Sequence, residues 1–196
     1  YRMTSEDLVS MVNVTPEMRV LDLAAGTGVL TKSLFAQHGE RLQVTLVEQA
    51  PEMLAVARKK LAQSAAEYIV GKAEEIGGTY QDVFDVVFCN AAFWQMQIDA
   101  TFAAVATVLQ AKGHFVFNLP DQVLADPLIT SQPTTPYPYN RSDITTTAQT
   151  HGFILRSFTV KRYTKTAAEA LAFMDIPVMQ MNHDDTARKR RKEELQ

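Results

Sequence analysis

The amino-acid sequence predicts an α/β fold in which a doubly wound, mostly parallel sheet carries helices on both faces. Short apolar runs bounded by turn residues alternate along the chain with segments whose apolar residues recur at helical spacing. Strands separated by amphipathic helices are typical of crossover units, and such units build parallel sheets. Residues 84–90 are nearly all apolar, as expected of a strand that is covered on both faces.

The individual elements follow from this alternation. Strands are expected at residues 19–24, 42–48, 67–71, 84–90, 114–119 and 154–164. Helices are expected at residues 28–38, 51–62 and 98–113, because Gly39 suits a C-cap, Pro51 suits a first helical position, and Gly113 can end the third helix. A short helix is also a candidate at residues 5–12, and another follows Thr166, which has capping-box spacing to Glu169. The five prolines of residues 120–138 indicate a loop or lid.

Composition limits the classes of function. The chain has 196 residues, which favours one domain, and a net charge of −3, which gives no basic field for nucleic acid or anionic lipid. No apolar run approaches the ~20 residues of a membrane span, and no signal peptide is recognisable, so a cytoplasmic setting without a membrane partner is expected. The single cysteine, Cys89, leaves no disulfide pair, and we expect no metal site.

A glycine-containing turn between the first strand and the first long helix predicts a ligand site. In residues 21–28, LDLAAGTG, Gly26 and Gly28 permit unusual backbone angles and close approach of a ligand. The following helix start offers free N–H groups and a partial positive charge. The dinucleotide pattern G-x-G-x-x-G is incomplete, because Thr31 occupies the third glycine position. Asp22, just before the turn, disfavours a diphosphate and suits an ammonium group.

Three further strand ends carry polar residues. Glu48 ends the second strand, 20 residues after Gly28, where a carboxylate can accept hydrogen bonds from the two hydroxyls of a ribose. Residues 71–75, GKAEE, follow the third strand and could border an adenine, and Asn90 ends the fourth strand.

Taken in order, these motifs resemble the class I S-adenosylmethionine-dependent methyltransferases, and they look closest to the small-molecule branch of that family. The match runs from about Pro16 to Leu119 and consists of VLDLAAGTG, LVEQAPEML, GKAEEI and FDVVFCNAAFWQM. The resemblance implies a Rossmann-like methyltransferase fold, S-adenosyl-L-methionine as the cofactor and S-adenosyl-L-homocysteine as its product. The family's usual seventh strand has no counterpart after Met174, so either the sequence is shortened or the sheet has six strands.

The resemblance also implies a set of cofactor contacts. The backbone of Ala24, Gly26 and Gly28 lines the methionine part, and Asp22 supports that loop. Glu48 binds the ribose, and Asn90 lies near the methionine amine and the sulfur, mainly through its carbonyl. The remaining members of the set are Gln49 and Met53 near the adenosine, and Lys72, Ala73 and Glu74 near the adenine. Lysine cannot accept the hydrogen bond that the family's usual acid accepts at position 72, so the backbone of Ala73 or Glu74 is expected to contribute.

Substrate contacts are expected from loops over the carboxyl ends of strands four and five. These are Phe93 and Trp94 after the fourth strand, and Tyr137 and Tyr139 in the proline-rich segment. Residues 173–181 could close the far wall. The sequence identifies no catalytic base; the candidates by residue type alone are His114, His151 and His183.

The predicted function is methyl transfer to a small-molecule acceptor by in-line displacement, driven mainly by positioning and water exclusion. The expected organisation is a single domain over residues 1–196, with a cofactor-binding core at 1–119 and lid and substrate-side elements at 120–196. The alternatives are a methyltransferase acting on RNA or protein, a nicotinamide-dependent oxidoreductase, and a sensor that binds the cofactor without catalysis. The sequence leaves the oligomeric state and the acceptor atom open.

Overall fold

A computed structural model describes residues 2–39, 41–62, 66–119, 141–161 and 163. The chain divides into two compact units, residues 1–156 and 157–196, and the fold described here belongs to the first. In the second unit, the described residues 157–161 and 163 form neither helix nor strand. Among the residues that the structure describes, no helix has the length and apolarity needed to cross a lipid bilayer.

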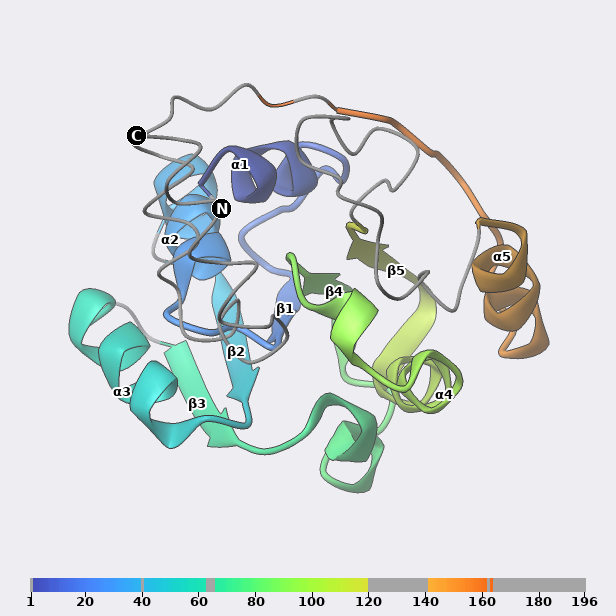
Figure 1. Ribbon diagram of the computed structural model, residues 1–196. Helices are drawn as coiled ribbons and strands as arrows, with labels where there is room; N and C mark the ends of the chain where they lie inside the picture. The colour runs from blue at the N-terminus through green and yellow to red at the C-terminus, as the bar shows by residue number, and fades with distance from the viewer. Residues whose placement is uncertain (1, 40, 63–65, 120–140, 162, 164–196) are drawn as a thin grey trace, which may run out of the picture. The chain divides into compact units, whose positions relative to one another are not determined.

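A parallel sheet of five strands forms the centre of the first unit (Figure 1). The strands are β1 (Arg19–Leu23), β2 (Gln43–Glu48), β3 (Ala66–Val70), β4 (Phe84–Cys89) and β5 (Leu109–Phe117). Their order is β3-β2-β1-β4-β5, and each neighbouring pair is parallel. The chain winds outward in one direction from β1 to β3 and in the other from β4 to β5. The carboxyl ends of β1 and β4 are therefore the switch point at which such folds bind ligands.

Helices cover both faces of this sheet (Figure 1). They are α1 (Arg2–Val9), α2 (Val29–His38), α3 (Pro51–Lys60), α4 (Ile98–Val108) and α5 (Arg141–Thr150), with two short 3-10 helices, η1 (Ala73–Gly78) and η2 (Phe93–Gln95). One buried cluster joins α1, α2 and α3 to one face of the sheet. A second cluster joins η1, η2, α4 and α5 to the other face. The doubly wound, parallel α/β fold expected from the sequence is thus confirmed.

The alternation of side chains along β1 and β4 shows how the sequence builds two cores. In β1, Val20 packs in the cluster with α2, whereas Leu21 and Leu23 pack in the cluster with α4. In β4, Val86 and Val87 likewise face opposite sides, and both are fully buried. Successive strand residues point to opposite faces, so a strand covered by helices on both sides needs apolar residues at nearly every position.

The boundary between α4 and β5 differs from the expected one. The helix ends at Val108 instead of continuing to Gly113, because Leu109 takes an extended conformation and pairs with Phe84. A bulge separates this pair from the next, Val86 with His114. Within the bulge, a Cβ atom on Gly113 would lie 2.8 Å from Leu109 Cδ2, so the glycine is required by close packing. Helical spacing placed Leu109 correctly in the core but assigned it to the wrong element.

The prediction of a sixth strand at residues 154–164 is also wrong. Residues 154–161 and 163, the part of this segment that the structure describes, carry no strand. Ile154, Leu155 and Phe158 are more than half exposed. A strand-like pattern forms a strand only when a neighbouring strand pairs with it, and the sequence does not specify that neighbour. The helix expected after Thr166 and the loop expected at 120–138 lie outside the described residues.

Two helices near the ends of the first unit complete the comparison. The N-terminal helix expected at residues 5–12 is present as α1, shifted toward the N-terminus. By contrast, α5 was not expected, because its sequence, RSDITTTAQT, is rich in threonine, a poor helix former. Its one fully packed side chain, Ile144, belongs to the core beside α4. Tertiary packing on α4 therefore overrides the weak local preference.

Candidate functional site

The turn between β1 and α2 brings three residues of left-handed backbone to the switch point. Ala24, Gly26 and Gly28 have φ angles of 55°, 56° and 74°. The turn is closed by hydrogen bonds from the Ala25 N–H to the Val47 carbonyl and from the Gly28 N–H to the Ala25 carbonyl. For a residue with a Cβ this conformation costs roughly 1–2 kcal/mol, so Ala24 is held by the surrounding structure.

The two glycines serve different needs. A Cβ atom on Gly28 would lie 3.0 Å from Leu61 Cδ1 and 3.1 Å from Ala57 Cβ, so this glycine lets α2 start close to α3. A Cβ atom on Gly26 would meet nothing closer than Met53 Cε at 3.5 Å. Gly26 therefore leaves room on the outer side of the turn, as a ligand in contact with the backbone requires.

Glu48 connects the loops that follow three strands. Its Oε2 accepts a hydrogen bond from the Gly26 N–H at 2.9 Å, and its Oε1 accepts one from the Ala50 N–H at 2.9 Å. Its backbone carbonyl accepts the Gly71 N–H at 3.1 Å. The side chain is 7% exposed. A carboxylate offers about four acceptor positions, so two bonds to the protein leave capacity for the hydroxyls of a ribose.

Asp22 lies beneath the turn and is almost fully buried. Its Oδ2 accepts hydrogen bonds from the Thr31 hydroxyl at 2.6 Å and from the Thr31 N–H at 3.2 Å. Burial raises the pKa of the Asp22 carboxyl from 3.8 to about 7, and the nearby Glu48 charge adds to this, while the two bonds from Thr31 oppose it. Asp22 therefore holds the start of α2. Sequence reasoning noted Thr31 only as a missing glycine and did not identify it as the partner of Asp22.

The residues assigned to the adenosine side follow two different strands and differ in accessibility. Gln49 and Lys72 are exposed, and the Lys72 Nζ lies 3.7 Å from the Glu75 carboxylate, also at the surface. Ala73 is buried in the core beside α4. Glu74 accepts a hydrogen bond from the Gln97 N–H at 3.1 Å, just before α4. Ala73 is the only buried residue among these four, so packing holds its backbone more firmly than that of the others.

At the end of β4, Asn90 belongs to a network of side-chain hydrogen bonds. The Asn90 Nδ2 donates to the Ser5 hydroxyl of α1 at 2.8 Å. The Asn118 Nδ2 donates to the Asn90 Oδ1 at 2.9 Å, and the Asn118 Oδ1 accepts the N–H of Ala91. Sequence reasoning selected Asn90 but missed Ser5 and Asn118. A signal existed for Asn118, because it follows β5 as Asn90 follows β4, each one residue past the end of its strand.

The four aromatic residues expected to contact the substrate separate into three cases. Phe93 is fully buried and stacks among Phe102, Phe115 and Phe117, which favours a packing role over the predicted one. Trp94 is half-buried, and its indole N–H donates to the Ala91 carbonyl at 3.3 Å. Tyr137 and Tyr139 lie outside the described residues, as do residues 173–181.

The two candidate histidines that the structure describes, His114 and His151, make no hydrogen bond with the turn. His114 is exposed on β5, and His151 pairs with Asp99 at 2.9 Å, near the start of α4. His183 lies outside the part of the chain that the structure describes. No residue among those described is therefore assigned as a catalytic base.

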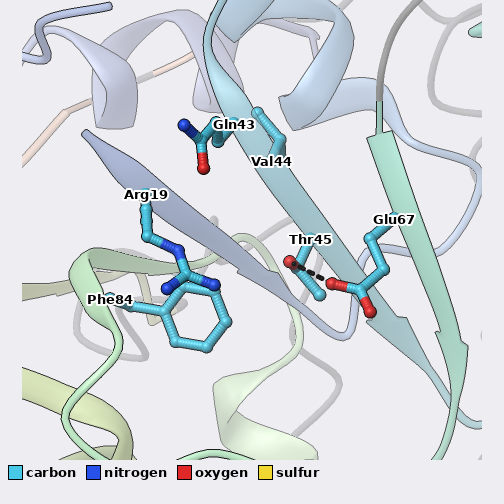
Figure 2. Close-up of a pocket in the computed structure, with 6 residues that line it drawn as sticks. All are labelled: Arg19, Gln43, Val44, Thr45, Glu67 and Phe84. Carbon is cyan, nitrogen blue, oxygen red and sulfur yellow. Dashed lines mark hydrogen bonds between the residues drawn. The ribbon is translucent and has the colours of Figure 1, made fainter. Parts of the chain in front are cut away.

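A hollow at the opposite end of the sheet is not the candidate site. Figure 2 shows it at the amino ends of the strands, lined by Arg19, Gln43, Val44, Thr45, Glu67 and Phe84. Its volume is about 190 Å³, below the ~300 Å³ at which small-molecule pockets usually begin. The turn, Glu48 and Asn90 all lie at the carboxyl ends instead.

Together these features fit an adenosyl amino acid better than a dinucleotide. Glu48 provides a carboxylate for a ribose, and Gly26 leaves its backbone open. Thr31 occupies the third glycine position of the dinucleotide pattern, and its hydroxyl and N–H are bonded to the buried Asp22 carboxyl. The residues present therefore fit S-adenosylmethionine.

Comparison with known proteins agrees with this interpretation. Residues 20–113 match the family model of the methyltransferase domain. The chain is 32% identical over 114 residues to the ubiquinone/menaquinone biosynthesis C-methyltransferase of Shewanella piezotolerans, a match that covers 56% of this chain and 44% of that protein. It is 41% identical over 110 residues to an uncharacterized methyltransferase of Mycobacterium tuberculosis, covering 54% and 42%.

A solved structure shares the fold. It is phosphoethanolamine N-methyltransferase 2 of Haemonchus contortus in complex with S-adenosyl-L-methionine, with a TM-score of 0.64 and 19% identity over 97% of this chain and 47% of that one. The chain spans less than half the length of the curated relatives named above. The matched motifs and the family model show that residues 20–113 are similar to a methyltransferase domain, and the strand order shows the fold of the S-adenosylmethionine-dependent methyltransferases.

Proposed function

We propose that this chain binds S-adenosylmethionine at the carboxyl ends of β1, β2 and β4 and transfers its methyl group to a small-molecule acceptor. The observation that carries the proposal is the bond between the Glu48 carboxylate and the Gly26 N–H at 2.9 Å. It joins the acid suited to a ribose directly to the turn suited to the amino acid part of the same ligand. Both halves of one binding site are thus fixed relative to each other.

Each residue has a defined task in this proposal. Glu48 accepts hydrogen bonds from the ribose hydroxyls with the acceptor positions that Gly26 and Ala50 leave open. The backbone from Ala24 to Gly28 lines the amino acid part, and Asp22 supports that backbone through Thr31. The carbonyl of Asn90 would contact the amine and sulfur side of the bound cofactor. When bound, the sulfonium supplies an activated methyl group, so the protein acts mainly by aligning the reactants and excluding water.

A small, partly apolar acceptor is favoured over RNA or protein. Trp94, half-buried beside Asn90, offers a flat apolar surface on the acceptor side. The net charge of −3 provides no basic field for a nucleic acid. The Shewanella relative, named for a C-methyltransferase step in quinone biosynthesis, supports an acceptor of this class.

The test is formation of S-adenosylhomocysteine in the presence of acceptors. The chain is incubated with methyl-labelled S-adenosylmethionine and a panel of quinols, phenols, amines and small carboxylic acids, with transfer RNA and bulk protein as competing classes. We expect label to transfer to at least one small molecule, and Glu48→Ala to abolish the transfer. Labelling of RNA or protein alone would contradict the proposed acceptor class, and cofactor binding without product from any acceptor would favour a sensor.

A further inference from the structure

We propose that Asn118 is a positioning residue for methyl transfer, which acts through Asn90 and Ala91; this inference rests on the function proposed above. Asn118 follows β5, and it was not among the residues implied by the sequence motifs. Its side chain makes two contacts with consecutive residues of the loop after β4. The Oδ1 accepts the Ala91 N–H, and the Nδ2 donates to the Asn90 Oδ1 at 2.9 Å.

The loop after β4 needs such support because its backbone is strained. Ala91 has a φ of 57°, in the left-handed region that residues with a Cβ rarely adopt. The conformation costs roughly 1–2 kcal/mol and persists only where neighbouring groups determine it. Asn118 holds the backbone N–H of Ala91 from the neighbouring strand, and the Asn118 N–H itself donates to the Cys89 carbonyl at 3.4 Å. One asparagine therefore fixes the corner at residues 90–91.

The corner determines the placement of groups on both sides of the reaction. On the cofactor side, Asn90 contributes its carbonyl, and its side chain continues to the buried Ser5 hydroxyl of α1 at 2.8 Å. On the acceptor side, the Trp94 indole N–H donates to the Ala91 carbonyl at 3.3 Å. A change at Asn118 thus moves the cofactor contact and the acceptor surface together. Because transfer depends on near-contact alignment of the two reactants, small movements are costly.

Two substitutions separate the contacts of Asn118. In Asn118→Ala both contacts are lost. In Asn118→Asp the carboxylate still accepts the Ala91 N–H but has no N–H to donate to Asn90. The matched control is Asn13→Ala, which removes an exposed asparagine from the loop before β1. Trp94 is the only tryptophan of the chain, so its fluorescence reports on this corner without a label.

The measurements are thermal unfolding, Trp94 emission without ligand, and calorimetric binding of S-adenosylhomocysteine, which lacks the sulfonium charge. We expect Asn118→Ala to weaken binding about tenfold and Asn118→Asp by about threefold, from the loss of two hydrogen bonds and of one. Trp94 emission should move to longer wavelength in Asn118→Ala and stay near the wild type in Asn118→Asp. Asn13→Ala should change neither quantity.

The possible failures are distinguishable. A folded Asn118→Ala protein with wild-type affinity and wild-type Trp94 emission would overturn the role of Asn118. Equal loss in Asn118→Ala and Asn13→Ala would also overturn it, because the effect would not belong to the corner. Failure of the wild-type chain to bind S-adenosylhomocysteine would refute the proposed function instead, and Trp94 emission would still test the corner.

Discussion

Replacing Glu48 by alanine should weaken both the fold and cofactor binding. The substitution removes the acceptor of two backbone N–H groups, those of Gly26 and Ala50, each bonded at 2.9 Å. An unsatisfied N–H costs ~1–3 kcal/mol, and the lower end applies here because both donors are only half-buried. The expected loss of unfolding free energy is therefore about 2 kcal/mol, or a fall in Tm of about 4–8 °C for a chain of this size.

The effect on binding should be larger. Two hydrogen bonds from ribose hydroxyls to an ionised carboxylate are worth at least ~1.5 kcal/mol each, so their loss should weaken binding of S-adenosylhomocysteine about 100-fold. Glu48→Gln keeps one carbonyl oxygen and should lie between the wild type and Glu48→Ala. The matched control is Glu17→Ala, an exposed acid before β1 that should leave both quantities unchanged.

Scanning calorimetry gives the Tm and titration calorimetry gives the affinity. A Glu48→Ala protein whose Tm stays within about 1 °C of the wild type would show that the two N–H contacts contribute little to stability. Wild-type affinity in the same protein would show that Glu48 does not bind the ribose. The two results are independent, so one part of the reasoning can fail while the other stands.

Three further comparisons test the surrounding structure. Because the pKa of Asp22 is raised to about 7 from 3.8, the folded state holds a proton that the unfolded state releases, and stability falls as pH rises from about 4 to 7. In urea unfolding, the free energy of unfolding of the wild type should fall by up to ~1.4 kcal/mol per pH unit relative to that of Asp22→Asn. Parallel plots of unfolding free energy against pH for the two proteins would contradict this. Gly28→Ala should be less stable than Gly26→Ala in the same assay, because its Cβ would lie 3.1 Å from Ala57 Cβ, whereas a Cβ on Gly26 would make only an ordinary contact with Met53 at 3.5 Å; equal losses would contradict the packing role. Phe93→Ala should lower the free energy of unfolding by ~3–5 kcal/mol and Trp94→Ala by much less, because Phe93 is fully buried and Trp94 is not. A larger loss in Trp94→Ala would contradict the assignment of Phe93 to the core.

The fold could be predicted from the sequence wherever local pattern and burial agree. The runs ending at Leu23, Glu48 and Cys89 lie in a sheet covered on both faces, so nearly every position is buried and the apolar residues in each run make the strand recognisable. The turn with Gly26 and Gly28 was recognisable because its left-handed backbone limits the residue types that fit. These local requirements were sufficient to place the candidate site at the switch point.

Other features depend on partners that are distant in sequence. Leu109 fits a helical stripe and a strand equally well, and its pairing with Phe84 decides between them. The segment at 154–161 has the pattern of a strand, yet it forms no strand in the described structure. Asn118, Ser5 and Thr31 gain their roles from contacts with residues that a search of local motifs does not connect to them.

The central claim is that the turn at Gly26, together with Glu48, binds an adenosyl amino acid and not a dinucleotide. Titration calorimetry of the wild-type chain with S-adenosylhomocysteine and, separately, with NAD⁺ tests it most directly. We predict saturable binding of S-adenosylhomocysteine at a single site and no measurable binding of NAD⁺. Binding of NAD⁺ with no heat from S-adenosylhomocysteine would contradict the account.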